Sequence, residues 1–376
     1  MPSRLPAQLS RINAASTAAS RAHKASTKRD YPACVTHART ALEHAPASFD
    51  LRTLRAACLL DSLASSSSSS GGAAAHAGTV AADALADLGR AAALSPSMPA
   101  ALLVRASYLS ALFASPPGTS DDGHDDGGGE GRRADANAGH WLAAPKHEAL
   151  THVKRCLHTD PDNKLCLRAH KKLKALERAL AKLGNWRDAH RHGEVVLSLA
   201  GEGGKDQGMI KLVQDIIDEA HLGGAHDDGE SVLPRALGAH NSLFLTALYE
   251  SLCRAHLSLG RSHARKATHI CVDVLGRREP DNVWALVGLA EKQMADDEFQ
   301  DAVRTLEKAH ERSGRQEREV RSLCPLLATQ PSCLTDKFSP RCEQIGERLQ
   351  KAQKLLRQAS IKVRLSAFAL TVSIGC

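Results

Sequence analysis

Four stretches of the chain repeat one spacing of small, apolar and proline residues. They are Ala84, Leu88, Ala91 and Pro96; Ala149, Val153, Cys156 and Pro161; Ala267, Cys271 and Val274, with Pro280 one position late; and Ala302, Leu306 and Ala309. Offsets of four and seven residues place these side chains on one face of an α-helix. The small first residue lets a neighbouring helix approach closely, and the proline ends the helix. The chain is therefore predicted to consist of helices stacked in pairs.

This spacing is typical of the second helix of a tetratricopeptide (TPR) repeat, a helix–turn–helix unit of about 34 residues. Hydrophobic residues make up 43% of the 376 residues, but aromatic residues only 3%, so the core must be built mainly from alanine and leucine. Such a core suits thin stacks of helices in which each unit contacts only its neighbours. The predicted fold is all-α, a TPR α-solenoid of stacked helix pairs with low-complexity insertions. A fold of this kind presents a binding surface.

The pattern divides the chain into two groups of predicted TPR units and a divergent end. The N-terminal units occupy 7–161 and are interrupted by two insertions predicted to be disordered, 64–78 and 115–144, which are rich in serine, glycine and aspartate. The C-terminal units occupy 162–314. Within them, an amphipathic helix over 208–222 belongs to an insertion near 202–238. The remaining segments are an irregular stretch at 315–346, a terminal helix at 347–362 and a tail at 363–376 that departs from the repeat design.

The net charge of +7 is unevenly distributed. The densest basic stretch runs from Lys164 to His192. It could attract an acidic partner or could simply be a solvated helix face, and the second interpretation is preferred. Aromatic residues do not alternate with these charges as base stacking requires, so no nucleic-acid partner is expected.

The ten cysteines do not resemble a metal or redox motif, because none form a C-x-x-C pair. Cys156 and Cys271 fall on core positions of the repeat and are expected to be free, buried thiols. Cys324, Cys333 and Cys342 are spaced by nine, but nothing resembling a zinc knuckle surrounds them and no fourth ligand is evident.

Other candidate ligand groups are also explained without a metal. The aspartates of the acidic loop at 121–129 lack the spacing of a calcium-binding loop. On the predicted helix from Trp186 to Leu199, which follows a turn at Gly184-Asn185, His190 and His192 point to different faces. Neither a metal nor a cofactor is predicted.

An enzymatic function is not supported by any motif. The chain has no glycine-rich phosphate loop and no nucleophile motif. His269 and Cys271 could suggest a thiol–imidazole pair, but residues two apart on a helix face different ways. We therefore predict no catalytic, cofactor-binding or metal-binding residue, and the binding residues are not assigned.

No targeting or membrane-spanning segment is predicted. Residues 1–21 lack the apolar core of a signal peptide, and the apolar tail at 367–376 is too short to cross a bilayer. A chain complete as written is expected to be soluble and cytoplasmic.

Several longer segments resemble one family. These are Lys154–Leu157, the Asp-Pro-Asp-Asn-Lys-Leu-Cys run at 160–166, the lysine-rich 171–176, the Glu-Pro-Asp-Asn-Val run at 279–283 and the closing Leu349–Gln358. They are similar to the TPR-bearing DnaJ co-chaperones of the endoplasmic reticulum lumen, of the DnaJ homolog subfamily C member 3 type. The similarity covers roughly 30–60, 79–113, 147–200, 241–310 and 347–360.

The resemblance implies a function in protein folding. In that family the repeats hold misfolded polypeptide clients, and a C-terminal J domain uses a His-Pro-Asp triplet to stimulate the ATPase of the lumenal heat-shock chaperone BiP. This sequence contains no His-Pro-Asp, and it is expected to lack the signal peptide, the first repeats and the J domain of the family. The resemblance thus implies a non-catalytic scaffold with polypeptide clients, a BiP-like partner and a location in the endoplasmic reticulum lumen.

Two alternatives remain open. One is a cytosolic TPR adaptor that grips the acidic C-terminal tail of a chaperone, although Asn137, Asn163, Asn185 and Asn241 fall in predicted loops or helix starts rather than on inner helix faces. The other is an incomplete gene product without independent function. A related hypothesis is that 320–346 and 363–376 are translated introns. Both begin with Val-Arg, which a sequence like a splice donor can encode, and both later contain Leu-Thr, which a sequence like a branch point can encode.

Overall fold

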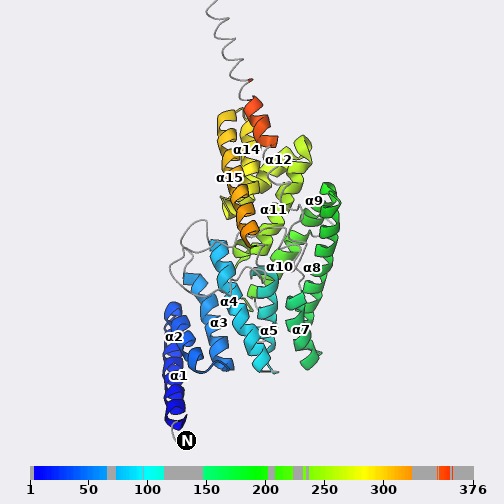
Figure 1. Ribbon diagram of the computed structural model, residues 1–376. Coiled ribbons are helices and arrows are strands. Elements are labelled where there is room, and N and C mark those ends of the chain that lie inside the picture. The colour runs from blue at the N-terminus through cyan, green and yellow to red at the C-terminus, as the bar shows by residue number, and fades with distance from the viewer. Residues whose placement is uncertain are drawn as a thin grey trace, which may run out of the picture. The chain divides into compact units, whose positions relative to one another are not determined.

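Helices form all the regular secondary structure in the described part of the computed structural model (Figure 1). The residues described are 4–65, 73–95, 97–113, 147–201, 208–222, 232–233, 237–323, 345, 347–355 and 358. The chain divides into two compact units, Met1–Leu248 and Tyr249–Cys376. This division differs from the one expected at 161/162, because a disulfide and helix packing join the residues on the two sides of that position. Each unit is described by itself.

The first unit begins with two helix pairs. Their helices are α1 (Arg4–Thr27), α2 (Tyr31–His44), α3 (Phe49–Ser65) and α4 (Ala73–Leu94). The turn between α1 and α2 is made by Arg29, which has a φ of 60°, and by Asp30, whose carboxylate accepts a hydrogen bond from the backbone N–H of Ala33. Pro32 lies in the first turn of α2, where its missing N–H costs nothing. Ala18 and Ala22 of α1 are buried against α2 at the expected one-turn spacing.

The rest of the first unit continues the same arrangement. Its elements are α5 (Ala100–Tyr108), which runs into the π-helix η1 (Leu109–Phe113), α7 (His147–Thr159), α8 (Lys164–Asp188), α9 (His192–Ala200), α10 (Met209–Leu222) and the 3-10 turn η2 (Ala239–Asn241). Asn163 begins α8 by accepting a hydrogen bond from the N–H of Cys166. The helix expected at 208–222 is present as α10, and it packs on α8 and α9 through buried side chains such as Val213 and Ile216.

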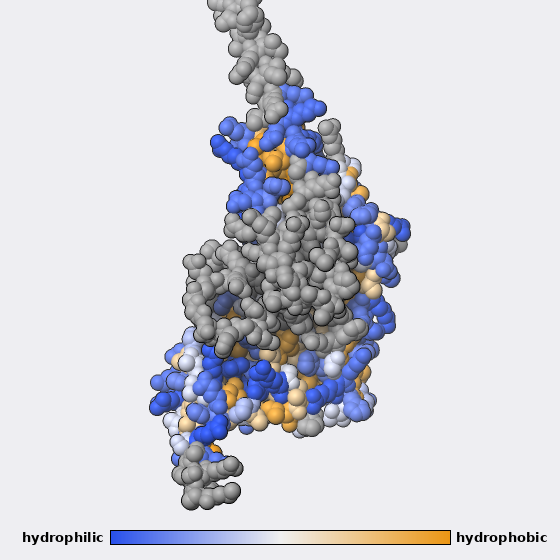
Figure 2. Space-filling model, viewed as in Figure 1, coloured by the Kyte–Doolittle hydropathy of each residue, from blue (hydrophilic) through white to orange (hydrophobic). Residues whose placement is uncertain are grey.

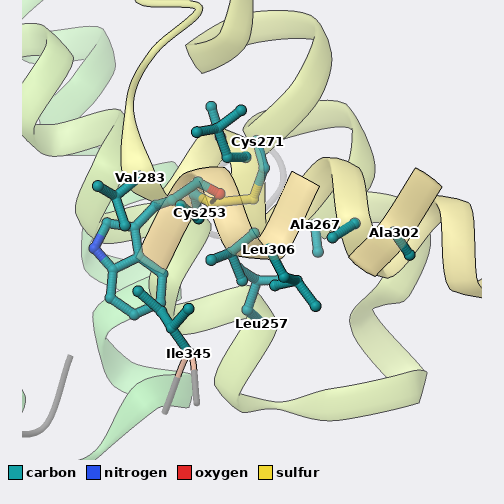
Figure 3. Close-up of a cluster of buried hydrophobic side chains, with 14 of the residues drawn as sticks. Cys253, Leu257, Ala267, Cys271, Val283, Ala302, Leu306 and Ile345 are labelled. Atoms are coloured by element: carbon teal, nitrogen blue, oxygen red, sulfur yellow. Dashed lines mark hydrogen bonds between the residues drawn. A yellow bond between two sulfur atoms is a disulfide. The ribbon is translucent and has the colours of Figure 1, made fainter. Parts of the chain in front are cut away.

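The described residues of the second unit form two further helix pairs and a terminal helix. Its elements are α11 (Leu243–Ser258, which starts in the first unit), η3 (Gly260–His263), α12 (Ala264–Thr268), the π-helix η4 (His269–Leu275), α13 (Gly276–Arg278), α14 (Val283–Ala295) and α15 (Phe299–Leu323). Residues 347–355 are helical, and Ile345 and Ala352 are buried in the same hydrophobic cluster as Leu306 (Figure 3).

The repeated spacing in the sequence corresponds to buried positions. The first two residues of every stretch are buried. In the third stretch, however, the buried residue after Cys271 is Leu275 rather than Val274, because η4 is a π-helix. A π-helix turn takes up one residue more than an α-helix turn. The late position of Pro280 follows from this added residue.

Three predicted boundaries are wrong. The insertion expected at 64–78 is shorter, since α4 already begins at Ala73 in an alanine-rich run, and Ala77 is buried. No turn occurs at Gly184-Asn185, because α8 continues to Asp188 and the chain turns at His190, with a φ of 53°. The irregular stretch expected from 315 is wrong over 315–323, because good helix formers carry α15 to Leu323. The insertion at 115–144 and the tail at 363–376 lie outside the described residues.

Candidate protein-binding surface

Among the described residues, six cysteines form three disulfides, so Cys156 and Cys271 are buried as expected but are not free thiols. The pairs are Cys34–Cys58, Cys156–Cys166 and Cys253–Cys271. The first two join the second helix of one pair to the first helix of the next, and the third joins the two helices of one pair. All six residues are buried. The signal in the sequence was that each cysteine at a core position has another one within 10 to 24 residues, on the neighbouring helix.

The structure does not support the thiol–imidazole pair considered at His269 and Cys271. The Cys271 sulfur is bonded to Cys253, and His269 is exposed, with its Nδ1 3.3 Å from an Asp273 carboxylate oxygen. His190 and His192 are not on one helix as expected: His190 lies in the turn after α8, and His192 begins α9. Across the described residues, no three His, Cys, Asp or Glu side chains are placed to hold a metal ion. Cys324, Cys333 and Cys342, and the acidic loop at 121–129, lie outside that part of the chain.

The charged groups between α3 and α4 belong to the helix interface. Asp87 of α4 is fully buried and accepts hydrogen bonds from Arg52, at 3.2 Å, and from Arg55, at 2.5 and 2.8 Å. Arg52 also donates to the carbonyl of Pro46. The two guanidinium groups compensate the negative charge of the buried carboxylate. These three side chains therefore hold α3 and α4 together, which is a structural role.

At the end of α11, a buried histidine lies beside a partly buried one. His256 is 3% exposed, and its Nδ1 is 3.1 Å from Nδ1 of His263. Burial lowers the pKa of His256 to about 4, with smaller contributions from the charges of His263 and Lys266. His256 is therefore neutral at pH 7.

The asparagines considered for gripping an acidic tail do not form a set. Asn163 caps α8, Asn185 lies within α8, and Asn241 ends η2. Asn137 is outside the described residues. Asn282, which is not one of these four asparagines, caps α14 and donates hydrogen bonds to Glu250 and Glu279. Asn163 and Asn282 thus serve as helix caps.

The surface of the first unit offers two features suited to a polypeptide. Leu9 and Ile12 of α1 are 57% and 62% exposed and lie three residues apart, so their side chains are neighbours on the helix surface. Leu9 lies on the side of α1 opposite Ala18, which is buried against α2. The second feature is the exposed side of α8, which is rich in lysine and arginine. Figure 2 shows mainly hydrophilic residues along the edge where Figure 1 places α8.

The chain is similar to co-chaperones that combine TPR repeats with a J domain. It is 31% identical over 300 residues to the tetratricopeptide repeat and J domain-containing co-chaperone DNJ1 of Mycosarcoma maydis, a match that covers 78% of this chain and 43% of that protein. It is 25% identical over 337 residues to DNJ1 of Cryptococcus neoformans var. grubii, covering 89% of this chain and 49% of that protein. DnaJ homolog subfamily C member 3 of Bos taurus is 24% identical over 214 residues, which cover 57% of this chain and 30% of that protein. The chain thus spans less than half the length of these relatives.

The fold is that of a TPR domain. The crystal structure of the P58(IPK) TPR domain superposes with a TM-score of 0.54 at 19% identity, covering 96% of this chain and 71% of that one. This similarity confirms the predicted all-α TPR solenoid. No protein-family model matches the chain. Among the described helices, none combines the length and the apolar character needed to cross a bilayer.

Proposed function

We propose that this chain is the non-catalytic, polypeptide-binding scaffold of a chaperone cofactor. The observation that carries the proposal is the similarity to TPR and J domain-containing co-chaperones over 78% of the chain. Stacked helix pairs support this function because they expose a long surface to a partner.

The proposed clients are unfolded polypeptides, and Leu9 and Ile12 are the proposed contact. Unfolded chains expose apolar side chains, which gain free energy when they leave water. Leu9 and Ile12 offer a large apolar contact on one helix face, and they are the two most exposed of the large hydrophobic residues described. A pair of this size would bind weakly and without sequence specificity, as holding a client requires.

The proposed compartment is the endoplasmic reticulum lumen, with a BiP-like heat-shock chaperone as the partner that receives the clients. Three disulfides support this location, because disulfides persist in oxidising compartments and are rare in the cytosol. Protease protection of the native protein in sealed microsomes tests this assignment. Digestion of the protein in intact microsomes would contradict it.

Client holding is tested by the aggregation of a thermally denatured model enzyme such as citrate synthase. The wild-type chain is expected to suppress light scattering, and L9S/I12S is expected to lose most of this effect. The matched control, L94S/L197S, replaces two exposed leucines that come from different helices and should behave like the wild type. Equal suppression by all three proteins would refute the proposed contact, and no suppression by the wild type would refute client holding.

A further inference from the structure

The net positive charge of the chain is concentrated in one helix. Helix α8 contains eight lysines and arginines and two acidic residues, a net charge of +6, whereas the whole chain carries +7. Its packing side is apolar and contacts α5, α7, α9 and α10. The buried residues on that side are Cys166, Ala169, Leu173, Leu176, Leu180 and Leu183.

Four basic residues form a row on the opposite side. Lys164, Lys171, Arg178 and Lys182 are all exposed. Their offsets of 7, 14 and 18 residues place them within an arc of about 40° at 3.6 residues per turn. We call these four residues the basic row. It is about 27 Å long, at 1.5 Å per residue.

The basic residues beside the row are already paired, whereas those of the row are not. Lys172 and Arg168 face Glu219 of α10, and Lys174 pairs with Glu177. By contrast, no carboxylate in the described part of the chain forms an ion pair with any of the four residues of the basic row. Four like charges on one helix face repel each other, so the row favours an anionic partner.

We propose that the basic row binds an acidic segment of a partner polypeptide. An extended chain advances about 3.3 Å per residue, so about eight residues rich in aspartate and glutamate would run its full length. Lysine suits such a partner, because its flexible ammonium group can meet carboxylates in several positions. This proposal does not depend on client holding, which involves a different helix.

The composition of the row argues against two other anionic partners. Binding of single-stranded nucleic acid combines basic residues with aromatic side chains on which bases stack, and no aromatic residue lies between Lys164 and Lys182. A helix that lies in a membrane surface needs a broad apolar face toward the lipid. Leu167, at 37% exposure, is the single large hydrophobic residue described as exposed on α8.

The test is fluorescence anisotropy with the full chain and a labelled ten-residue peptide of alternating aspartate and glutamate. The wild type should bind it at low ionic strength and release it in 0.5 M NaCl, since salt screens exposed charges. The variant K164Q/K171Q/R178Q/K182Q should bind about tenfold more weakly or worse, because it removes four exposed charge pairs with the peptide. Glutamine keeps the helix propensity, and thermal unfolding checks that the variant is folded.

The matched control is R11Q/R21Q/K24Q/K28Q, which removes four exposed charges from α1 and the turn that follows it and should bind like the wild type. Equal weakening by both variants would mean that only net charge matters, and would overturn the proposal. Unchanged binding by the α8 variant, or equal binding of an asparagine–glutamine peptide, would overturn it as well. So would wild-type binding to ten-residue oligothymidylate or to phosphatidylserine vesicles without binding to the acidic peptide. Suppression of client aggregation should be unchanged in the α8 variant, which separates this proposal from client holding.

Discussion

Gly288 of α14 lies against Cys271 so closely that a β-carbon on the glycine would stand 2.3 Å from the cysteine β-carbon and 3.1 Å from its sulfur. The helix pair can approach this closely only because position 288 has no side chain. The contact also places α14 beside the Cys253–Cys271 disulfide, within the hydrophobic cluster of the second unit (Figure 3).

Replacing this glycine with alanine should therefore destabilise the second unit. G288A must push α14 away from a disulfide-bonded helix, and such overpacking costs about 1–3 kcal/mol. Urea unfolding monitored by tryptophan fluorescence measures the change. The control is G184A in α8, where an added β-carbon meets nothing within 4 Å. That change should stabilise the helix by about 0.5–1 kcal/mol. Equal effects of the two substitutions would contradict the close contact.

Removing the Asp87 carboxylate should be far more costly than removing an exposed one. D87A leaves Arg52 buried and without its anion, and breaking a buried pair costs about 3–5 kcal/mol. The comparison is E194A, which removes an exposed ion pair with Arg191 at 2.8 Å and should change the free energy of unfolding by less than about 1 kcal/mol. Chemical denaturation of both variants tests the difference. A loss below 1 kcal/mol for D87A would mean that the buried pair is not formed.

The predictable part of the fold is the part set by local periodicity. The alanine, leucine and proline spacing identified the second helices because burial repeats every three to four residues along a helix. The π-helix at His269–Leu275 was visible only as Pro280 falling one position late, a shift that a single sequence cannot assign to a cause. The end of α15 is not marked by the repeat spacing, which stops before residue 315, although residues 315–323 are good helix formers and remain helical.

The disulfides could not be derived because pairing depends on which helices are neighbours. Cys156 of α7 and Cys166 of α8 lie on either side of the turn that joins the two helices. Only the antiparallel packing of these helices brings the two α-carbons to 6.3 Å. The basic row could not be derived from the sequence for the same reason. The sequence revealed the charges between Lys164 and His192, but the carboxylate of Glu219 that neutralises some of them comes from α10, 47 residues after Lys172. Without that helix in place, paired and unpaired lysines look alike.

Reduction of the disulfides should lower stability substantially. Closing loops of 10, 18 and 24 residues restricts the unfolded chain, which corresponds to about 3 kcal/mol for each bond. Adding dithiothreitol should therefore lower the melting temperature, and C34A/C58A should reproduce part of the loss. Peptide mapping without reduction checks the pairs directly. Recovery of Cys34 or Cys58 as an alkylated thiol from the oxidised protein would show that this pair does not form.

The buried His256 should make the stability of the second unit depend on pH. Its pKa is lowered to about 4, chiefly by burial, whereas an unfolded histidine titrates near 6.5. The unfolded chain therefore binds more protons between pH 6.5 and 4, so the stability contributed by neutral His256 is complete above pH 6.5 and is lost as the pH falls toward 4. The free energy of unfolding lost over this pH range approaches about 3 kcal/mol, at 1.36 kcal/mol per pH unit. Urea unfolding at pH 7.5, 6.5, 5.5 and 4.5 should show a shallower decline for H256Q than for the wild type. H269Q, which changes a 67% exposed side chain, should keep the wild-type slope, and parallel curves for H256Q and the wild type would refute the burial of a neutral imidazole.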